Sequence, residues 1–219
     1  MLVLVFDTET TGLIKEDTVK IDDFPHIVQI SFILYDTVSK KMIECCDFII
    51  NCKNKFKIPI ESSKIHGITE EISIKQGVSI RTALQKFYDT VRKANYLVAH
   101  NLPFDDKMVQ IEFTRLGLDG QMLMSETNLN RLDKYCTMKN SRNLCKISVK
   151  SAKGKMYYKN PKQSELHNYL FGTVPENLHN SLNDILVTLR CYAMMMLKVD
   201  LNNNCNKFKT ISTDQMIFG

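Results

Sequence analysis

The chain has 219 residues, 44% of them hydrophobic, and a formal net charge of +5. This length suits one large domain or two small ones, and the mild basic excess is compatible with a nucleic-acid partner without demonstrating one. No apolar run approaches the ~20 residues that a membrane-spanning helix requires, and no basic leader precedes the first apolar run, so the sequence argues against both a membrane protein and a secreted one.

The chain begins with a short, continuous apolar run, residues 2–5, which is typical of a buried strand. Asp7 and Glu9 follow it, two residues apart. Because side chains alternate along a strand with a period of two, both carboxylates point to one face if the strand continues through them. Two interpretations are open: a pair of hard oxygen ligands for Mg²⁺ or Mn²⁺, or two solvated acids at a strand end.

The next segments predict an antiparallel meander. Residues 25–35 and 42–50 are two further strands joined by a turn, and three early strands with tight connections favour antiparallel pairing. An irregular basic loop at residues 51–60 and a turn at residues 65–69 follow. Thr69, with two glutamates after it, is expected to begin a short helix.

Helical periodicity becomes clear after Ser79, the expected N-cap of a helix. The apolar side chains of that helix recur at helical spacing: Ile80, Ala83, Leu84, Phe87 and Val91. A buried strand at residues 96–99 comes next, and a turn leads from it into a second helix. That helix carries Asp105 in its first turn and is expected to end at Gly117.

The second half of the chain is less regular. Residues 120–163 show no clear pattern, and a short helix at 165–171 follows, with Ser164 as its expected N-cap. A long helix at 181–198 includes a methionine run, residues 194–196, that is expected to pack in the core. Residues 199–219 are expected to form a polar C-terminal tail. The order of elements predicts one α/β domain at residues 1–198 with a mixed sheet.

Three segments place acids beside strand or helix ends. They hold Asp7 with Glu9, then Asp105, then His179 with Asp184. If the first strand and the last helix are neighbours, four carboxylates and one histidine meet. Such a cluster requires cations, and two divalent ions roughly 3.5–4 Å apart are the usual arrangement where phosphodiesters are cut.

These segments resemble the motifs of the DEDD-type 3′-5′ exonucleases. FDTETTGL at residues 6–13 is similar to the family's DxE motif, AHNLPFD at 99–105 to its second motif, and H-x4-D at 179–184 to its third. The accessory segment IHGIT at 65–69 also fits. Position 180 is Asn rather than Tyr, so the resemblance is to the histidine subclass (DEDDh), which includes proofreading subunits of DNA polymerases. It covers about residues 1–197.

The resemblance implies an RNase H-like fold, in which an antiparallel meander and parallel strands form a mixed sheet flanked by helices. It implies a metal-dependent 3′-5′ exonuclease that acts on single-stranded 3′ ends and releases nucleoside 5′-monophosphates. By resemblance, two Mg²⁺ or Mn²⁺ ions are held by four carboxylates: Asp7, Glu9, Asp105 and Asp184. His179 is the implied general base, a role that suits an imidazole.

The resemblance also implies substrate contacts. The backbone around Thr10 and Gly12 holds the terminal nucleotide, and Leu13 lies against its base. Phe104 supplies a face for stacking or sugar packing, and Asn101 lies in a matching segment that lines the pocket.

For the histidines, structural and functional interpretations compete. His66 is either a pocket residue or a turn histidine bonded to backbone, and both interpretations stay open. His100 leaves a buried strand and matches no catalytic position of the family, so a structural role is expected. His26 and His167 are interpreted as surface or packing residues.

Between residues 134 and 162 the chain carries nine basic residues and no acid. They are Lys134, Lys139, Arg142, Lys146, Lys150, Lys153, Lys155, Lys159 and Lys162. We interpret residues 134–163 as a basic insertion that forms a rim for nucleic-acid phosphates, with Tyr157 and Tyr158 available for stacking. A solvated loop without a partner is the alternative.

The motifs are shared by enzymes that act on DNA and on RNA, because sugar discrimination depends on groups near the 2′ position. The likeness to proofreading subunits favours DNA. An exoribonuclease and an inactive nucleic-acid-binding module are the alternatives, although the presence of all five catalytic residues argues for activity. Since the chain has no polymerase region, a proofreading role requires a polymerase or another replication or repair partner.

The seven cysteines are an odd number, and no two of them have CxxC spacing. We interpret them as free thiols, which predicts an intracellular, reducing compartment such as cytoplasm or nucleus. A zinc site built from Cys45, Cys46 and Cys52 is the alternative, although these residues lack the usual ligand spacing.

Overall fold

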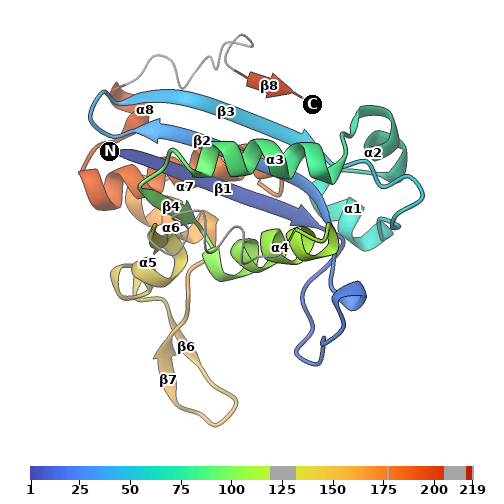
Figure 1. The fold of residues 1–219 in the computed structure, drawn as a ribbon. Coiled ribbons are helices and arrows are strands. Elements are labelled where there is room, and N and C mark those ends of the chain that lie inside the picture. Colours follow the sequence, from blue (N-terminus) through green and yellow to red (C-terminus); the bar gives the residue numbers. More distant parts are fainter. Residues whose placement is uncertain (119–131, 177, 205–215, 219) are drawn as a thin grey trace.

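The computed structural model of the chain describes residues 1–118, 132–176, 178–204 and 216–218. A six-stranded mixed sheet of order β5-β4-β1-β2-β3-β8 runs through its centre (Figure 1). The strands are β1 (Leu2–Thr10), β2 (Ile27–Asp36), β3 (Lys41–Ile49), β4 (Tyr96–Ala99), β5 (Asp133–Cys136) and β8 (Met216–Phe218). The first three form an antiparallel meander, and the other three join in parallel pairs. The predicted mixed sheet is confirmed.

Helices cover both faces of the sheet. Figure 1 shows α3 (Ile80–Val91) and α4 (Leu102–Arg115) on the near face and α7 (Ser181–Tyr192) on the far face. Alternate side chains of β1 divide between these two layers. Phe6 packs with Phe87 of α3, their ring centroids 5.3 Å apart, whereas Val5 packs with the buried residues of α7. This alternation decides which face receives each polar side chain at the end of β1.

The parallel partner of β1 is shorter than β1 itself. β4 pairs with β1 only as far as the Val5↔Val98 pair, and β4 ends at Ala99. Beyond that point no strand of the described residues lies beside one edge of β1, while the other edge stays paired with β2, Asp7 lying opposite Ser31. A chain segment that follows β4 can therefore approach the second half of β1 from the open edge.

Smaller elements complete the described chain. They are η1 (Ile21–Asp23), α1 (Ile60–His66), α2 (Glu70–Gln76), α5 (Thr137–Cys145), β6 (Ser148–Lys150), β7 (Met156–Tyr158), α6 (Gln163–Phe171), the π-helical turn η4 (Ala193–Leu197) and α8 (Leu201–Asn204). The predicted caps are confirmed for two helices: Thr69 accepts the Ile72 N–H, and Ser79 accepts the Thr82 N–H. None of the helices in the described ranges combines the length and apolar character that a bilayer crossing requires.

Two helix predictions were wrong. The sequence predicted a loop and a turn where α1 forms, because this seven-residue helix leaves Ile60 and Ile65 exposed and so lacks an amphipathic pattern. α6 begins at Gln163, before the predicted cap Ser164. The Glu165 carboxylate accepts the Lys162 N–H at 2.7 Å. This bond, and not one to the Ser164 side chain, satisfies a backbone donor at the start of the helix.

The prediction of an irregular segment at 120–163 was wrong for its second part. This part contains β5, α5 and the β6–β7 hairpin, whereas residues 119–131 lie outside the described residues. β5 exposes Asp133 and Lys134 at the sheet edge, so its sequence does not show the alternation that predicts a strand.

The described start of the C-terminal segment packs against α7. Leu201 is buried against the α7 face, and Arg190 of α7 holds Asp200 through two hydrogen bonds of 2.8 and 2.9 Å. β8 extends the sheet beside β3. The predicted core role of the methionine run was wrong for Met196, which is 47% exposed. The predicted tail also includes residues 205–215 and 219, which lie outside the described residues.

Candidate active site

Two carboxylates of the site project from β1. The strand continues through Asp7 and Glu9 to Thr10, so both side chains lie on one face, as the spacing predicted. They continue the series of Val3 and Val5, which pack against α7. Asp7 and Glu9 therefore face the N-terminal end of that helix.

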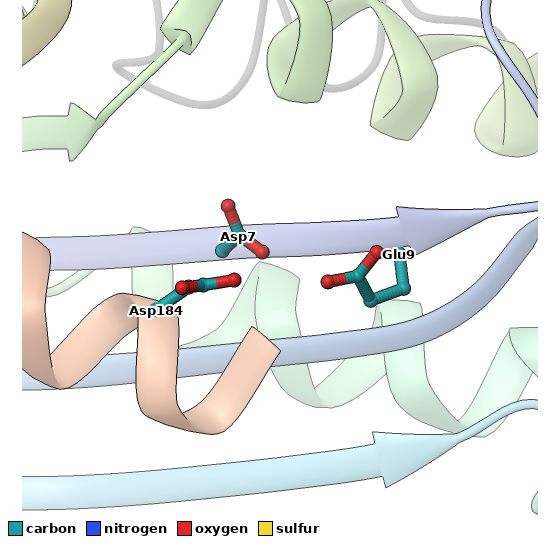
Figure 2. Close-up of side chains that lie close together, drawn as sticks. All are labelled: Asp7, Glu9 and Asp184. Atoms are coloured by element: carbon teal, nitrogen blue, oxygen red, sulfur yellow. The ribbon is translucent and has the colours of Figure 1, made fainter. Parts of the chain in front are cut away.

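The third carboxylate comes from the first turn of α7. Asp184 is buried, and ligand oxygens of Asp7, Glu9 and Asp184 all lie within 4.8 Å of one another. Figure 2 shows the carboxyl groups of the two β1 residues turned toward the carboxyl group from α7. Residues 175 positions apart in the sequence thus meet because β1 and α7 pack against each other.

Asp105, the fourth predicted carboxylate, lies beside this group of three and outside it. It occupies the first turn of α4 and reaches the open edge of β1, where its Oδ1 accepts the N–H of Thr8 at 3.0 Å and the Thr8 hydroxyl at 2.8 Å. Its charge still acts on Asp7, whose pKa it helps to raise. The structure therefore brings three carboxylates into direct convergence and places the fourth next to them.

Burial raises the pKa values of all four groups, and repulsion from neighbouring carboxylates adds to this effect for Asp7, Glu9 and Asp105. Burial and the charges of Asp184 and Asp105 raise the pKa of Glu9 to about 8. Burial raises the pKa of Asp105 to about 7 and that of Asp184 to about 6. The pKa of Asp7 lies well above its ordinary value, because it is buried among the other three carboxylates. Four ionised carboxylates at this spacing require a positive charge between them.

The donor set fits a divalent cation of the Mg²⁺ or Mn²⁺ type. Asp7, Glu9 and Asp184 offer only carboxylate oxygens, the ligands that hard cations prefer. The Oδ1 of Asp184 is buried and has no hydrogen-bond partner, although its Oδ2 accepts the His179 N–H at 3.1 Å. A buried oxygen without a donor is expected at a cation ligand. In the described part of the chain, this is the only group of three or more potential ligands close enough to share an ion.

The zinc alternative is not supported. Cys45, Cys46 and Cys52 each belong to a different hydrophobic cluster, because consecutive residues of β3 point to opposite faces. The six cysteines that the structure describes are free thiols. Burial raises the pKa of Cys45, Cys46 and Cys191 to about 12, so these thiols stay protonated.

His179 reaches the site through its backbone. It lies in the loop before α7 with φ of 68°, and its N–H holds Asp184. Its imidazole is exposed and is not among the ligand atoms that converge. The structure thus places His179 at the rim of the carboxylate group, and its role as a base stays a prediction.

A buried polar network anchors the start of α7, and sequence reasoning missed it. Asp47 of β3 accepts hydrogen bonds from Ser31 at 2.6 Å and from Gln29 at 2.8 Å. The Ser31 hydroxyl also bonds that of Ser181, the first residue of α7, and the Ser181 N–H donates to Gln29. Ser31 pairs directly with Asp7 across β1 and β2, so strand register was the signal that could have revealed it.

The loop after β1 is held by local hydrogen bonds. The Thr10 hydroxyl donates to the carbonyl of Gly12 at 2.6 Å, and the Thr11 N–H donates to the His26 carbonyl at 2.9 Å. Ser62 of α1 donates to the Thr11 carbonyl, which ties α1 to this loop. Leu13 follows and leaves 81% of its surface exposed. The predicted contact of Leu13 with the terminal base stays a prediction.

The other predicted pocket residues differ in how far they are buried. His66 is buried, its Nδ1 accepts the Ile68 N–H at 3.1 Å, and its Nε2 has no partner. The structural interpretation of His66 therefore accounts for one ring nitrogen, and burial lowers its pKa. Asn101 is the exposed N-cap of α4, and Phe104 is half-buried against the core. Their substrate roles stay predictions.

Three histidines have packing roles, as predicted. His100 bonds the Thr137 hydroxyl at 3.0 Å and the Pro161 carbonyl at 3.1 Å, and burial lowers its pKa to about 4. His26 stacks on Phe56 with ring centroids 4.4 Å apart. His167 is buried between the Thr173 carbonyl and the guanidinium of Arg190.

Comparison with known proteins identifies the family of this chain and proteins of similar fold. A family model described as exonuclease matches residues 4–192. A DNA polymerase III of PolC type from Mycoplasmopsis pulmonis is 28% identical over 127 residues, which are 58% of this chain and 8% of that protein.

Solved structures of exonuclease I are similar in fold. A crystal structure of the Escherichia coli enzyme in complex with a dT13 oligonucleotide has a TM-score of 0.66 at 15% identity, covering 93% of this chain and 42% of that one. A second exonuclease I structure has a TM-score of 0.67 at 16% identity, covering 95% and 44%. This chain therefore spans less than half the length of these relatives, and at such identities the likeness establishes the fold alone.

Proposed function

Because this chain belongs to the exonuclease family, as its DEDDh motifs predicted, we propose that it removes nucleotides from the 3′ ends of single-stranded DNA. It hydrolyses phosphodiester bonds and releases nucleoside 5′-monophosphates. We assign this activity to residues 1–198, most of which the family model matches. Residues 199–219 then follow the catalytic domain.

The observation that carries the proposal is the convergence of Asp7, Glu9 and Asp184 within 4.8 Å. Bringing these three acids together is costly for folding, because each carboxyl group resists ionisation there. The buried Oδ1 of Asp184, which has no hydrogen-bond donor, adds to this cost. A purely structural role gives no reason to keep such a cluster. Nuclease chemistry gives one, since the acids together bind cations that a phosphodiester also requires.

Two divalent ions, Mg²⁺ or Mn²⁺, are the proposed cofactors. Asp7, Glu9 and Asp184 would hold one, and Asp7 with Asp105 would hold the other. When bound, such ions stabilise the charge on phosphoryl oxygens and lower the pKa of a bound water. The protein's own contribution is to hold the four carboxylates in place: two on β1, one on α7 and one on α4.

His179 is the proposed general base. An imidazole at the rim can take the proton of the attacking water while the carboxylates stay ionised. The His179 N–H fixes Asp184, so one residue orients a ligand with its backbone and offers a base with its side chain. The left-handed backbone conformation of His179, with a φ of 68°, directs its N–H to Asp184 while its imidazole stays exposed at the rim.

The terminal nucleotide is proposed to lie on the loop formed by Thr10, Gly12 and Leu13. The hydrogen bonds of this loop support the choice, because they present a formed backbone surface next to the carboxylates. Leu13 would pack on the terminal base, with Phe104, Asn101 and His66 around the sugar and phosphate. We favour DNA because the exonuclease I structures hold DNA oligonucleotides, and a polymerase partner because the PolC-type relative is a polymerase.

We also propose an intracellular, reducing compartment. The six described cysteines are free thiols, five of them buried in the protein. Such a protein does not need an oxidising compartment for its stability.

The test uses a 5′-labelled single-stranded oligonucleotide with Mg²⁺ or Mn²⁺. We expect a ladder that shortens from the 3′ end, and nucleoside 5′-monophosphates as products. D7N should remove the ladder while leaving the protein folded, because Asp7 takes part in both proposed ion sites. D89N, at an exposed acid on α3, is the matched control and should retain full activity.

A folded wild-type sample that removes no nucleotide with either ion would overturn the proposal. Matched DNA and RNA oligonucleotides in the same assay separate the proposed DNA activity from an exoribonuclease. Binding of either oligonucleotide without any cleavage would instead identify a nucleic-acid-binding module.

A further inference from the structure

The β6–β7 hairpin stands apart from the rest of the fold. Its two strands form a sheet of their own, and Figure 1 shows the hairpin extending away from the central sheet beyond α5. A two-stranded hairpin is at best marginally stable alone in water. Contacts where it joins the rest of the fold must therefore hold it in place.

The exposed side chains of the hairpin combine rings with positive charge. Tyr157 is 51% exposed, Tyr158 42% and Met156 59%. Lys150, Lys153 and Lys155 are also exposed, and among the described residues none of these three lysines has an ion-pair partner. No acid lies between residues 134 and 162 to offset them.

The register places these groups on both faces of the hairpin. Tyr158 lies opposite Ser148, and Met156 opposite Lys150, on one face, whereas Tyr157 lies opposite Val149 on the other. The turn is well formed: the Gly154 N–H donates to the Ser151 carbonyl at 2.9 Å, and Gly154 has a φ of 81°. The lysines and tyrosines are thus presented by a defined hairpin and not by an irregular loop.

The root of the hairpin, residues 161–163 just after β7, is bonded to α7 and to the turn after β4. The Gln163 amide donates to the backbone carbonyl of Asp184 at 2.6 Å and to Thr188 at 3.0 Å. On the other side, His100 bonds the Pro161 carbonyl. Tyr158 and Gln163 are five positions apart, so their Cα atoms lie at most about 18 Å from each other. The segment directly after the hairpin is therefore tied to α7, the helix that supplies the Asp184 carboxylate.

From this arrangement we infer that the β6–β7 hairpin binds the single-stranded DNA upstream of the 3′ end. Lys150, Lys153 and Lys155 contact backbone phosphates, and Tyr157 and Tyr158 stack on bases. The inference rests on the proposed function, which brings a polyanion to the neighbouring carboxylates. It explains why two tyrosines are exposed on a hairpin that carries no negative charge.

The first experiment measures binding without catalysis. Fluorescence anisotropy in EDTA follows a labelled oligothymidine of roughly 20 nucleotides, longer than the ~4–16 nucleotides that one single-strand-binding fold covers. The triple variant K150Q/K153Q/K155Q should bind about tenfold or more weakly, and the slope of log K against log salt should fall by about 2. K41Q/K53Q/K75Q removes the same charge from exposed lysines elsewhere and should keep the wild-type slope.

The tyrosines are tested separately, because stacking does not depend on salt in the same way. Y157T/Y158T keeps residues that favour strands and should weaken binding about fivefold or more with an unchanged salt slope. Y157F/Y158F keeps the rings and should restore wild-type affinity.

The outcomes separate this inference from the proposed function. Wild-type binding by the hairpin variants, or equal losses in hairpin and control lysine triples, overturns the hairpin site. A wild-type protein that binds through the hairpin but cleaves no DNA with either Mg²⁺ or Mn²⁺ overturns the nuclease proposal and leaves the hairpin site standing. When cleavage occurs, the hairpin variants should also lose the preference for an oligonucleotide of about 20 over one of about 4 nucleotides.

Discussion

Thr8 donates two hydrogen bonds to a single oxygen of Asp105, one from its backbone N–H at 3.0 Å and one from its hydroxyl at 2.8 Å. The N–H is available because β4 ends at Ala99 and leaves this edge of β1 open. Both bonds lower the pKa of Asp105, against the burial that raises it to about 7. Thr8 thus keeps Asp105 closer to its ionised form.

T8V is therefore expected to shift the pH dependence of the nuclease. Valine keeps the shape of threonine and removes the hydroxyl, so the pKa of Asp105 should rise further. A hydrogen bond to a charged group contributes about 1.5–3 kcal/mol, so the acidic limb of the activity profile should move about one pH unit or more toward alkaline pH. Initial rates on a DNA oligonucleotide between pH 5 and 9 measure this shift.

T90V is the matched control, because Thr90 is buried and its hydroxyl bonds Glu44 at 3.0 Å, away from the site. It should lose a similar amount of stability and keep the wild-type pH profile. Identical profiles for wild type and T8V would contradict the proposed role of the Thr8 hydroxyl.

S31A should reduce activity more than its effect on stability explains. Ser31 joins Asp47 to Ser181 beneath the start of α7, and Asp184 lies in the next residues of that helix. Removing the hydroxyl leaves buried partners unsatisfied, which costs about 1–3 kcal/mol, and releases the helix start that positions Asp184. Unfolding by urea and the rate of nucleotide release measure the two effects.

Ser73 offers a matched control for this substitution. It is fully buried, its hydroxyl donates to the Ile50 carbonyl at 2.7 Å, and it accepts the Cys52 N–H at 2.9 Å. S73A should therefore destabilise the protein to a similar degree while its maximal rate stays near wild type. Equal losses of rate in both variants would show that stability, and not the position of Asp184, is responsible.

L13A should weaken substrate binding without destabilising the protein. The Leu13 side chain is 81% exposed, so truncation removes little buried surface and should change stability by less than about 0.5 kcal/mol. If Leu13 packs on the terminal base, KM should rise about fivefold or more, since fully burying a leucine side chain contributes about 1.5–3 kcal/mol. V19A, at an 87% exposed valine, is the control and should leave KM unchanged.

Stability in the absence of metal should fall as the pH rises. Folding raises the pKa values of Glu9 to about 8, Asp105 to about 7 and Asp184 to about 6, so the folded protein holds protons that the unfolded chain releases. This contribution is complete near the ordinary carboxyl pKa of about 4 and is lost as the pH rises toward 8. Tm of chelator-treated protein should therefore be lower at pH 8.5 than at pH 5.5.

Mn²⁺ should reverse this loss at high pH, because protons no longer compete for the carboxylates. At about 100 times Kd a ligand adds about 2.7 kcal/mol, which corresponds to roughly 5–10 °C in Tm for a chain of this size. D7N should show a smaller pH effect and a smaller response to Mn²⁺. An equal Mn²⁺ effect at pH 5.5 and 8.5 would contradict a carboxylate site.

The local features of the chain could be predicted from the sequence. Asp7 and Glu9 are two positions apart after an apolar run, and a strand puts such residues on one face whatever surrounds it. Ser79 as a helix cap is equally local, because the hydrogen bond that it accepts spans only three residues. Predictions of this kind succeeded since their physical cause lies within a few neighbouring residues.

Tertiary structure alone decided how these groups meet. The length of β4 determines that Asp105 bonds Thr8 at an open strand edge, and the packing of α7 brings Asp184 to β1 while the His179 imidazole stays exposed at the rim. The network of Ser31, Asp47 and Ser181 joins three distant segments, and the hairpin root is bonded to Asp184 through Gln163. Contacts between residues far apart in sequence depend on register and packing of whole elements, which no local pattern specifies.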